Sequence, residues 1–342
     1  IQLFTKWVPK PGSLSREITK EAVHLALRRL NKSSIDLMQY HAWHYPNPSW
    51  LDALYYLKEL KDEGLIKHIG VTNFDAAHLR IAKTSGIPIV SNQISHSLID
   101  DRANTADMID VCTKHNIKLN AYGVVMGGYL TKKWLNKNEP NQENLSTWSE
   151  MKYKRFIDES GGWNSYQNLL SVVNKIALNH NASIANICSK YILDNPRVSG
   201  IIIGARLGQN DHIIDNQNIL NIEITKSERN KIEEAQKSLN SIPGNCGDEY
   251  RKAPFLTASG DLSHHYKKIP KVFDSMLVSK DRKHISSKTK WESMASYSRA
   301  VKVKNRILVS RTTATHGKLT IGLNDPVAQT HFILEKIEAS IN

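Results

Sequence analysis

Residues 64–74 read GLIKHIGVTNF, and this stretch decides the fold assignment. Gly64 is typical of the C-terminal end of a helix. The apolar residues of 68–71 predict a short buried strand, and the polar pair Thr72 and Asn73 follows directly after it. A helix, a short strand and a polar strand end, in this order, form the repeating unit of parallel α/β folds. The sequence on both sides repeats this unit.

Six short apolar runs predict strands, at residues 1–8, 35–40, 68–71, 88–94, 118–122 and 198–203. Amphipathic segments predict helices at 15–30, 49–64, 75–85, 105–115, around 166–177, at 183–193 and from 225 to 239. Ser15 is expected to cap the first helix, and Ser49 and Thr225 are expected to open capping boxes. The polar excursion at 131–162 is expected to be a lid or binding loop. The fold class is therefore α/β, either an open doubly wound sheet or a (β/α)8 TIM barrel that lacks its first two β/α units.

Polar side chains stand at or near the carboxyl ends of five successive predicted strands. They are Lys6, His41, the pair Thr72 and Asn73, the pair Asn92 and Gln93, and the pair Tyr122 and Gly123. Because the loops that follow barrel strands converge at one face, these groups are expected to share one site. Lys6 alone would be interpreted as a surface lysine and His41 as a core histidine, but their adjacent strand ends favour the shared site. Strand alternation places Tyr40 opposite His41 and excludes it as the proton donor of such a site.

These motifs resemble the aldo-keto reductase superfamily in their order and spacing. The resemblance covers roughly residues 1–240 and rests on Phe4-Thr5-Lys6, Asp36-Leu37 with His41, residues 64–74, Asn92-Gln93, and Gly204-Ala205-Arg206 with Asp215-Asn216. It implies a barrel enzyme that transfers hydride from NADP to an aldehyde or ketone, with an Asp, a Tyr, a Lys and a His acting together. By resemblance Lys6 and His41 are the last two, and the Asp and the Tyr donor are expected upstream of Ile1.

The same resemblance implies a cofactor site. Its nicotinamide end would be held by Thr72, Asn73, Gln93, Tyr122 and Gly123, and its adenosine end by Gly204, Ala205, Arg206, Asp215 and Asn216. Glycines let a backbone approach phosphate, and the Arg206 guanidinium offers a bidentate partner for a 2′-phosphate, so NADP is expected rather than NAD. A glycine turn that only closes the barrel is the alternative interpretation.

The chain changes character after residue 240. Residues 241–290 are expected to form an irregular linker, and residues 291–342 a second domain with a hairpin at 300–309 and a helix capped by Asp325. Residues 297–301, 309–314 and 325–330 resemble the first half of a RidA-like domain, which implies an alternative function in imine or enamine hydrolysis. Arg311 stands where that family usually has glycine. Residues 244–265 resemble the linker of reductases fused to RidA-like domains, an architecture that includes subunits of the flagellar radial spoke.

Composition limits the possible partners. The formal net charge is +13, but the basic residues are spread along the chain, and the densest run, at 280–290, lacks the aromatic residues that stack on bases. No nucleic-acid partner is therefore expected. No metal is expected either, because the cysteines form no CxxC pair. No apolar run reaches the length of a membrane span. Three widely spaced cysteines, Cys112, Cys188 and Cys246, suggest a reduced compartment. The expected partner is a small carbonyl substrate in the cytoplasm; the alternative is docking onto acidic filaments in a ciliary axoneme.

Overall fold

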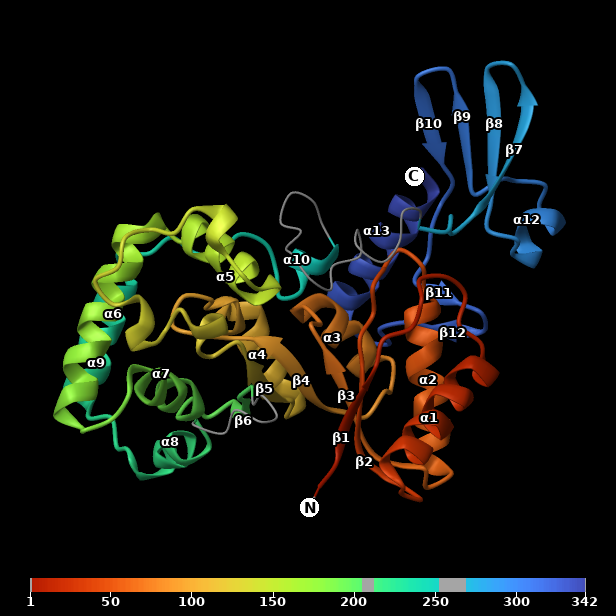
Figure 1. The fold of residues 1–342 in the computed structure, drawn as a ribbon. Coiled ribbons are helices and arrows are strands. Elements are labelled where there is room, and N and C mark those ends of the chain that lie inside the picture. Colours follow the sequence, from red (N-terminus) through yellow and green to blue (C-terminus); the bar gives the residue numbers. More distant parts are fainter. Residues whose placement is uncertain (1, 205–211, 252–268, 342) are drawn as a thin grey trace. The chain divides into compact units, whose positions relative to one another are not determined.

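The computed structural model describes residues 2–204, 212–251 and 269–341. Their contacts divide the chain into two compact units (Figure 1). The first unit contains Ile1–Val71, Ala76–Val90 and Tyr266–Asn342, and the second contains Thr72–Asp75 and Ser91–His265.

The first unit begins with parallel strands that are neighbours in sequence order, β1 (Phe4–Trp7), β2 (Ile35–Tyr40) and β3 (Ile66–Thr72). Its helices there are α1 (Arg16–Leu30), α2 (Ser49–Asp62) and α3 (Ala76–Thr84), of which α1 and α2 pack together. Ser15 caps α1, as predicted, by accepting a hydrogen bond from the Ile18 amide. The capping box predicted at Ser49 is wrong, because the turn begins earlier and Asn47 accepts the Ser49 amide at 3.0 Å.

The tail of the first unit is an antiparallel sheet followed by a long helix (Figure 1). The sheet order is β10-β9-β8-β7, formed by β7 (Asp274–Ser279), β8 (Arg282–Ser286), β9 (Ala300–Val303) and β10 (Arg306–Val309). The β9–β10 hairpin confirms the sequence prediction. The irregular structure predicted over 274–286 is wrong, and its physical reason is that β7 is exposed along its whole length, so no alternation of apolar and polar residues marks it. The remaining elements are α12 (Lys290–Met294), β11 (Thr315–His316), β12 (Leu319–Thr320) and α13 (Pro326–Ile341).

Helix α13 packs on α3 within the first unit. Asp325 starts α13 as predicted, because its Oδ1 accepts the Ala328 amide at 3.0 Å. The other carboxylate oxygen lies 2.7 Å from Arg80 Nε of α3. His316 and Asp52 of α2 make a further contact of 2.7 Å. The tail therefore shares a compact unit with residues 1–71 and 76–90, while the domain boundaries expected at 240 and 290 stay predictions.

The second unit has three parallel strands, again neighbours in sequence order: β4 (Ile89–Ser95), β5 (Lys118–Tyr122) and β6 (Val198–Ile202). Sequential order in both units is typical of a barrel, whereas a doubly wound sheet reverses its order part-way. The α-helices are α4 (Ala106–His115), α5 (Trp148–Glu159), α6 (Gly162–Asn179), α7 (Ile184–Leu193), α8 (Ile213–Gln217), α9 (Lys226–Gln236) and α10 (Asp248–Arg251). Short 3-10 turns are Arg102–Asn104, Met126–Gly128, Lys132–Trp134, Gln142–Asn144 and Asn218–Asn221. The capping box predicted at Thr225 is present.

The excursion at 131–162 contains helix α5 and packs into the second unit's core. Trp134 stacks on Tyr129 with ring centroids 4.9 Å apart, and Trp163 of α6 meets Trp134 at 5.8 Å. The buried Tyr166 hydroxyl donates to the Tyr129 carbonyl at 2.6 Å. This part of the chain is therefore a packed element with its own aromatic core.

Candidate functional site

Lys6 and His41 lie on one face of the β1–β2 pair. Lys6 is in register with Gln39, and Gln39 and His41 are two positions apart on β2 and its end, so the three side chains share a face. The His41 amide donates to the Trp7 carbonyl at 3.0 Å, and its buried ring stacks on Trp43 with centroids 5.0 Å apart. Tyr40 lies on the opposite face, where its ring is 5.5 Å from that of Trp7. The alternation therefore brings Lys6 and His41 together and excludes Tyr40.

Gln39 is a further candidate site residue on this face, and its strand position, two residues before His41, carried the signal. Its side chain is buried, and no group in the described ranges makes a hydrogen bond to its Oε1. Lys6 is exposed as a residue, and partial desolvation of its ammonium lowers its pKa. This face therefore offers a cation, an amide and an imidazole side by side.

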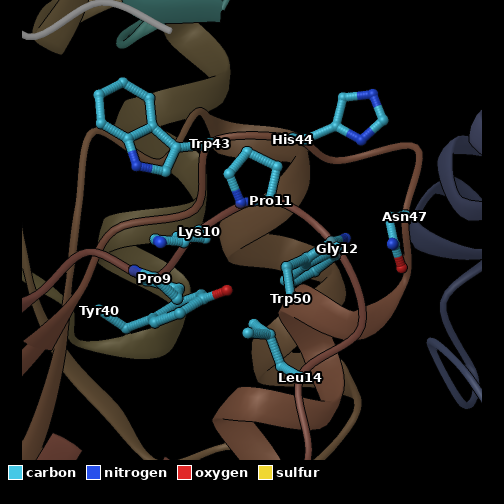
Figure 2. A pocket seen from close by; sticks show the side chains of 10 residues that line it. All are labelled: Pro9, Lys10, Pro11, Gly12, Leu14, Tyr40, Trp43, His44, Asn47 and Trp50. Carbon is cyan, nitrogen blue, oxygen red and sulfur yellow. The ribbon is translucent and has the colours of Figure 1, made fainter. Parts of the chain in front are cut away.

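A small pocket is lined by Tyr40 and Trp50 and does not include Lys6, Gln39 or His41 (Figure 2). Its volume is about 20 Å³, which is room for roughly one water molecule. It therefore cannot hold a substrate. Its lining residues are Pro9, Lys10, Pro11, Gly12, Leu14, Tyr40, Trp43, His44, Asn47 and Trp50.

In the second unit, three of the residues expected at the nicotinamide end are bonded to one another. The Tyr122 hydroxyl donates to Asn73 Oδ1 at 2.8 Å, and the backbone amide of Asn73 donates to the backbone carbonyl of Gln93 at 2.8 Å. Thr72 is buried, and its Oγ1 has no hydrogen-bond partner among the described residues. A buried hydroxyl without a protein partner fits a polar ligand group such as a carboxamide.

Gly123 allows a close approach that no other residue would. Its φ is +72°, and a Cβ there would lie 2.2 Å from the hydroxyl of Tyr153 on α5. Burial raises the pKa of Tyr153 to about 12. Gly123 therefore acts by admitting a neighbouring phenol, in addition to the cofactor role that the resemblance implies.

The residues expected at the adenosine end are only partly described. No atom of the described residues lies within 4 Å of where a Cβ of Gly204 would be, while Ala205 and Arg206 lie outside the described residues. Asp215 accepts hydrogen bonds from Ser183 Oγ at 2.9 Å and Asn186 Nδ2 at 3.0 Å, at the start of α7. Asn216 is half-buried in α8.

Two residues that the sequence analysis did not single out meet Tyr122. Lys152 Nζ of α5 donates to the Tyr250 hydroxyl of α10 at 2.6 Å, and the Tyr250 and Tyr122 hydroxyls are 3.1 Å apart. Burial, and then the nearby Tyr250 and Glu249, raise the pKa of Tyr122. Burial also disfavours the Lys152 ammonium, but Tyr250, Tyr153 and Glu249 outweigh it and raise the lysine pKa.

A buried charge cluster, Asp100, Arg102, Glu249 and Lys152, lies next to these hydroxyls. Arg102 holds both carboxylate oxygens of Asp100 at 2.8 Å and reaches Glu249 Oε2 at 2.7 Å. Glu249 is also 3.8 Å from Lys152 Nζ. The two cations balance the two anions, which is the condition under which buried charges are tolerated.

Other chemistries find no support in the described residues. Cys246 is buried, and burial raises its pKa well above the usual value, so it is not an activated thiolate. The adjacent pair His264 and His265, which cannot simply converge on one metal ion, lies outside the described ranges. Within those ranges no cluster of three His, Cys, Asp or Glu could hold a metal ion, and no helix is long and apolar enough to cross a membrane.

Comparison with known proteins decides the family. Residues 1–237 match the Aldo/keto reductase family along most of the chain. The chain belongs to the aldo/keto reductase family. Aldo/keto reductases are oxidoreductases that generally use NAD(P)H and act on small carbonyl compounds.

The curated relatives of this aldo/keto reductase chain differ in kind. It is 29% identical to flagellar radial spoke protein 5 of Chlamydomonas reinhardtii over 131 residues, which is 38% of this chain and 24% of that protein. It is 28% identical to protein tas of Escherichia coli over 221 residues, 58% of this chain and 62% of that protein. The chain thus spans less than two thirds of either relative.

Solved aldo/keto reductase structures share the fold. Glycerol dehydrogenase AKR11B4 from Gluconobacter oxydans superposes with a TM-score of 0.55 at 21% identity, over 67% of each chain. The holo form of AKR11C1 from Bacillus halodurans gives 0.53 at 22% identity, over 71% of this chain and 74% of that one. At these identities the likeness concerns the fold alone.

Proposed function

We propose that this aldo/keto reductase chain carries out NADP-dependent hydride transfer to an aldehyde or ketone. The observation that carries the proposal is the bonded group of Tyr122, Asn73 and Gln93 beside the unmatched buried hydroxyl of Thr72. The side-chain amide of Asn73 and the hydroxyl of Thr72 suit the carboxamide of nicotinamide, which has one hydrogen-bond acceptor and two donors. Gly123 completes this end of the site.

NADPH, when bound, supplies the hydride. Lys6 and His41 prepare the carbonyl and the proton donor, because an ammonium beside a phenol favours its anion and an imidazole orients the substrate oxygen. The lowered pKa of Lys6 is consistent with an ammonium that lies against protein atoms.

The preference for NADP over NAD rests on Arg206. We assign Gly204, Ala205 and Arg206, with Asp215 and Asn216, to the adenosine end, where the guanidinium would hold the 2′-phosphate in a bidentate contact. Titration of the full-length protein with NADPH and NADH tests this assignment. Equal affinity for the two cofactors would remove the role given to Arg206.

The activity is tested by NADPH oxidation with a panel of small aldehydes. The full-length protein is compared with Lys6→Met and with a matched control, Lys32→Met, in which an exposed lysine beyond α1 is changed. We expect the first substitution to abolish turnover and the second to leave it unchanged. An unaffected rate in Lys6→Met would mean that the turnover does not come from this site.

A second candidate is a subunit of a large assembly, and the similarity to flagellar radial spoke protein 5 favours it. The net charge of +13 suits docking onto acidic filaments such as microtubules in a ciliary axoneme. Co-sedimentation of the full-length protein with microtubules at low and high salt tests this candidate. If the protein shows no salt-sensitive binding to microtubules but turns over aldehydes, the assembly candidate is excluded and the reductase proposal stands.

The RidA-like assignment of residues 291–342 stays a prediction. The β9–β10 hairpin and α13 have the order expected of the first half of such a domain. Imine or enamine hydrolysis is the corresponding alternative activity. Release of ammonia from a 2-imino acid generated in situ is the assay, and no increase over the spontaneous rate would exclude this activity.

A further inference from the structure

A directed chain of hydrogen bonds runs through the second unit. It starts at Lys152 Nζ, passes through the hydroxyls of Tyr250 and Tyr122, and ends at Asn73 Oδ1, with successive distances of 2.6, 3.1 and 2.8 Å. An ammonium group can only donate, so the Tyr250 oxygen accepts at that end and its proton is available for Tyr122. Tyr122, having accepted, donates to the carbonyl oxygen of the Asn73 amide.

The direction of this chain decides how the Asn73 amide is oriented. An asparagine amide has an acceptor and a donor that can exchange places by a half-turn of the side chain. With Oδ1 held by the Tyr122 hydroxyl, Nδ2 is the group left to donate to a ligand. A donor at this position matches the carbonyl oxygen of a carboxamide.

The segment 245–251 also holds the backbone of Asn73. Arg251 Nη1 donates to the Asn73 carbonyl at 2.9 Å. A Cβ on Gly247, whose φ is +86°, would lie 2.3 Å from the same carbonyl oxygen, so this close packing requires glycine. Side chain and backbone of Asn73 are thus both positioned by a segment predicted to be a linker.

Lys152 also orients the rings. Its ammonium lies 5.1 Å from the ring centroid of Tyr122 and 4.7 Å from that of Tyr250, both within the range of cation–π attraction. Lys152 is itself paired with Glu249, and Arg102 joins Glu249 to Asp100 in the buried charge cluster. The ammonium therefore links the Tyr122 ring to the buried charge cluster.

We propose that Tyr250 and Lys152 are positioning residues for the nicotinamide end of the cofactor site, and that segment 245–251 belongs to this site. They act through Asn73 and Tyr122 and need not touch the cofactor. The proposal rests on the proposed function, because that function assigns the carboxamide and the ring to Asn73 and Tyr122.

The test uses the full-length protein with Tyr250→Phe, which removes the hydroxyl that joins Lys152 to Tyr122. Tyr191→Phe is the matched control, because the Tyr191 hydroxyl also donates to a side chain, Gln236 Oε1 of α9 at 3.2 Å, and lies outside the cofactor site. The first measurement is the side-chain amide resonance of Asn73 in cofactor-free protein, assigned by its loss in Asn73→Asp. We expect a shift in Tyr250→Phe, none in Tyr191→Phe, and retention in Lys152→Arg, which keeps a donor-only cation. An unshifted resonance in Tyr250→Phe would overturn the proposal whether or not the cofactor binds.

The second measurement compares the dissociation constants of NADPH and adenosine 2′,5′-bisphosphate, which lacks the nicotinamide. Loss of one oriented hydrogen bond should weaken NADPH binding by about tenfold in Tyr250→Phe and leave the bisphosphate unchanged. Equal weakening of both ligands, or of neither, would overturn the positioning role. If the unsubstituted protein binds neither ligand, the proposed function itself fails, which is a different result from a selective or unselective effect of the substitution.

Discussion

Removing the guanidinium of Arg102 should cost far more than an average core substitution. The side chains of Arg102, Asp100 and Glu249 are 3%, 0% and 1% exposed. Arg102→Met keeps most of the side-chain volume but leaves two buried carboxylates with Lys152 as the remaining cation of the cluster. The perturbation is therefore a loss of charge balance with little change in packing.

The magnitude follows from the bonds that are lost. Arg102 makes three hydrogen bonds of 2.7–2.8 Å to carboxylates and one of 3.0 Å to the Asn245 carbonyl. Removal of one partner from a buried ion pair costs about 3–5 kcal/mol, because the other charge stays desolvated. We therefore expect the free energy of unfolding to fall by about 4 kcal/mol at pH 7. Urea denaturation followed by circular dichroism measures this change.

The loss should depend on pH with a definite sign. Burial raises the pKa of Asp100, but Arg102 outweighs burial and holds that pKa below its usual value. In the unsubstituted protein this carboxylate contributes stability that is present above its unfolded pKa and is lost as the pH falls through its lower folded pKa. In Arg102→Met the guanidinium no longer opposes the effect of burial, so the pKa of Asp100 rises and its carboxyl is protonated at higher pH. Protonation removes the buried negative charge and with it part of the loss in stability. The difference in the free energy of unfolding between the unsubstituted protein and Arg102→Met should therefore become smaller from pH 7 to pH 5.

Two variants complete the experiment. Arg306→Met removes an exposed arginine of β10 and should change stability by less than about 0.5 kcal/mol. Adding Asp100→Asn and Glu249→Gln to Arg102→Met should recover part of the lost stability, because no buried carboxylate then remains in the charge cluster. A loss below about 1 kcal/mol in Arg102→Met, or a loss that does not vary with pH, would refute the reasoning.

Three further outcomes follow from local geometry. Gly247→Ala should lower the free energy of unfolding by at least about 2 kcal/mol in urea titrations, because the added Cβ would meet the Asn73 carbonyl. The control is Gly86→Ala, which has a similar φ of +85° but no described atom within 4 Å of the added Cβ, and it should cost only about 1 kcal/mol. Equal losses in the two variants would contradict the steric argument. Thr225→Ala should cost about 1 kcal/mol through loss of the α9 capping box, and a chevron or melt indistinguishable from the parent would count against it. Burial, and then Arg299, lower the pKa of Lys336 to about 8. Competitive acetylation followed by mass spectrometry should therefore show the reactivity of Lys336 rising through pH 8. A midpoint above about pH 10 would disprove the lowered pKa.

Much of the fold was predictable because it depends on neighbouring residues. The six parallel strands, the N-cap at Ser15, the capping box at Thr225 and the start of α13 at Asp325 all follow from periodicity or cap chemistry within a few residues. The capping box at Ser49 failed because the Asn47–Pro48 turn starts the helix first, which a four-residue pattern does not reveal. Strand β7 escaped prediction because an exposed strand lacks alternation.

The sequence by itself also determined the family and the strand-end residues, since a polar group after an apolar run is visible in one line of text. What only the tertiary structure decided is the surroundings of Tyr122. Lys152 lies in a polar excursion, 30 positions after Tyr122, and Tyr250 lies in a predicted linker, 128 positions after Tyr122. No local pattern marks either residue, because their role comes from packing α5 and α10 against the end of β5, and such contacts form between segments whose sequences are independent of one another.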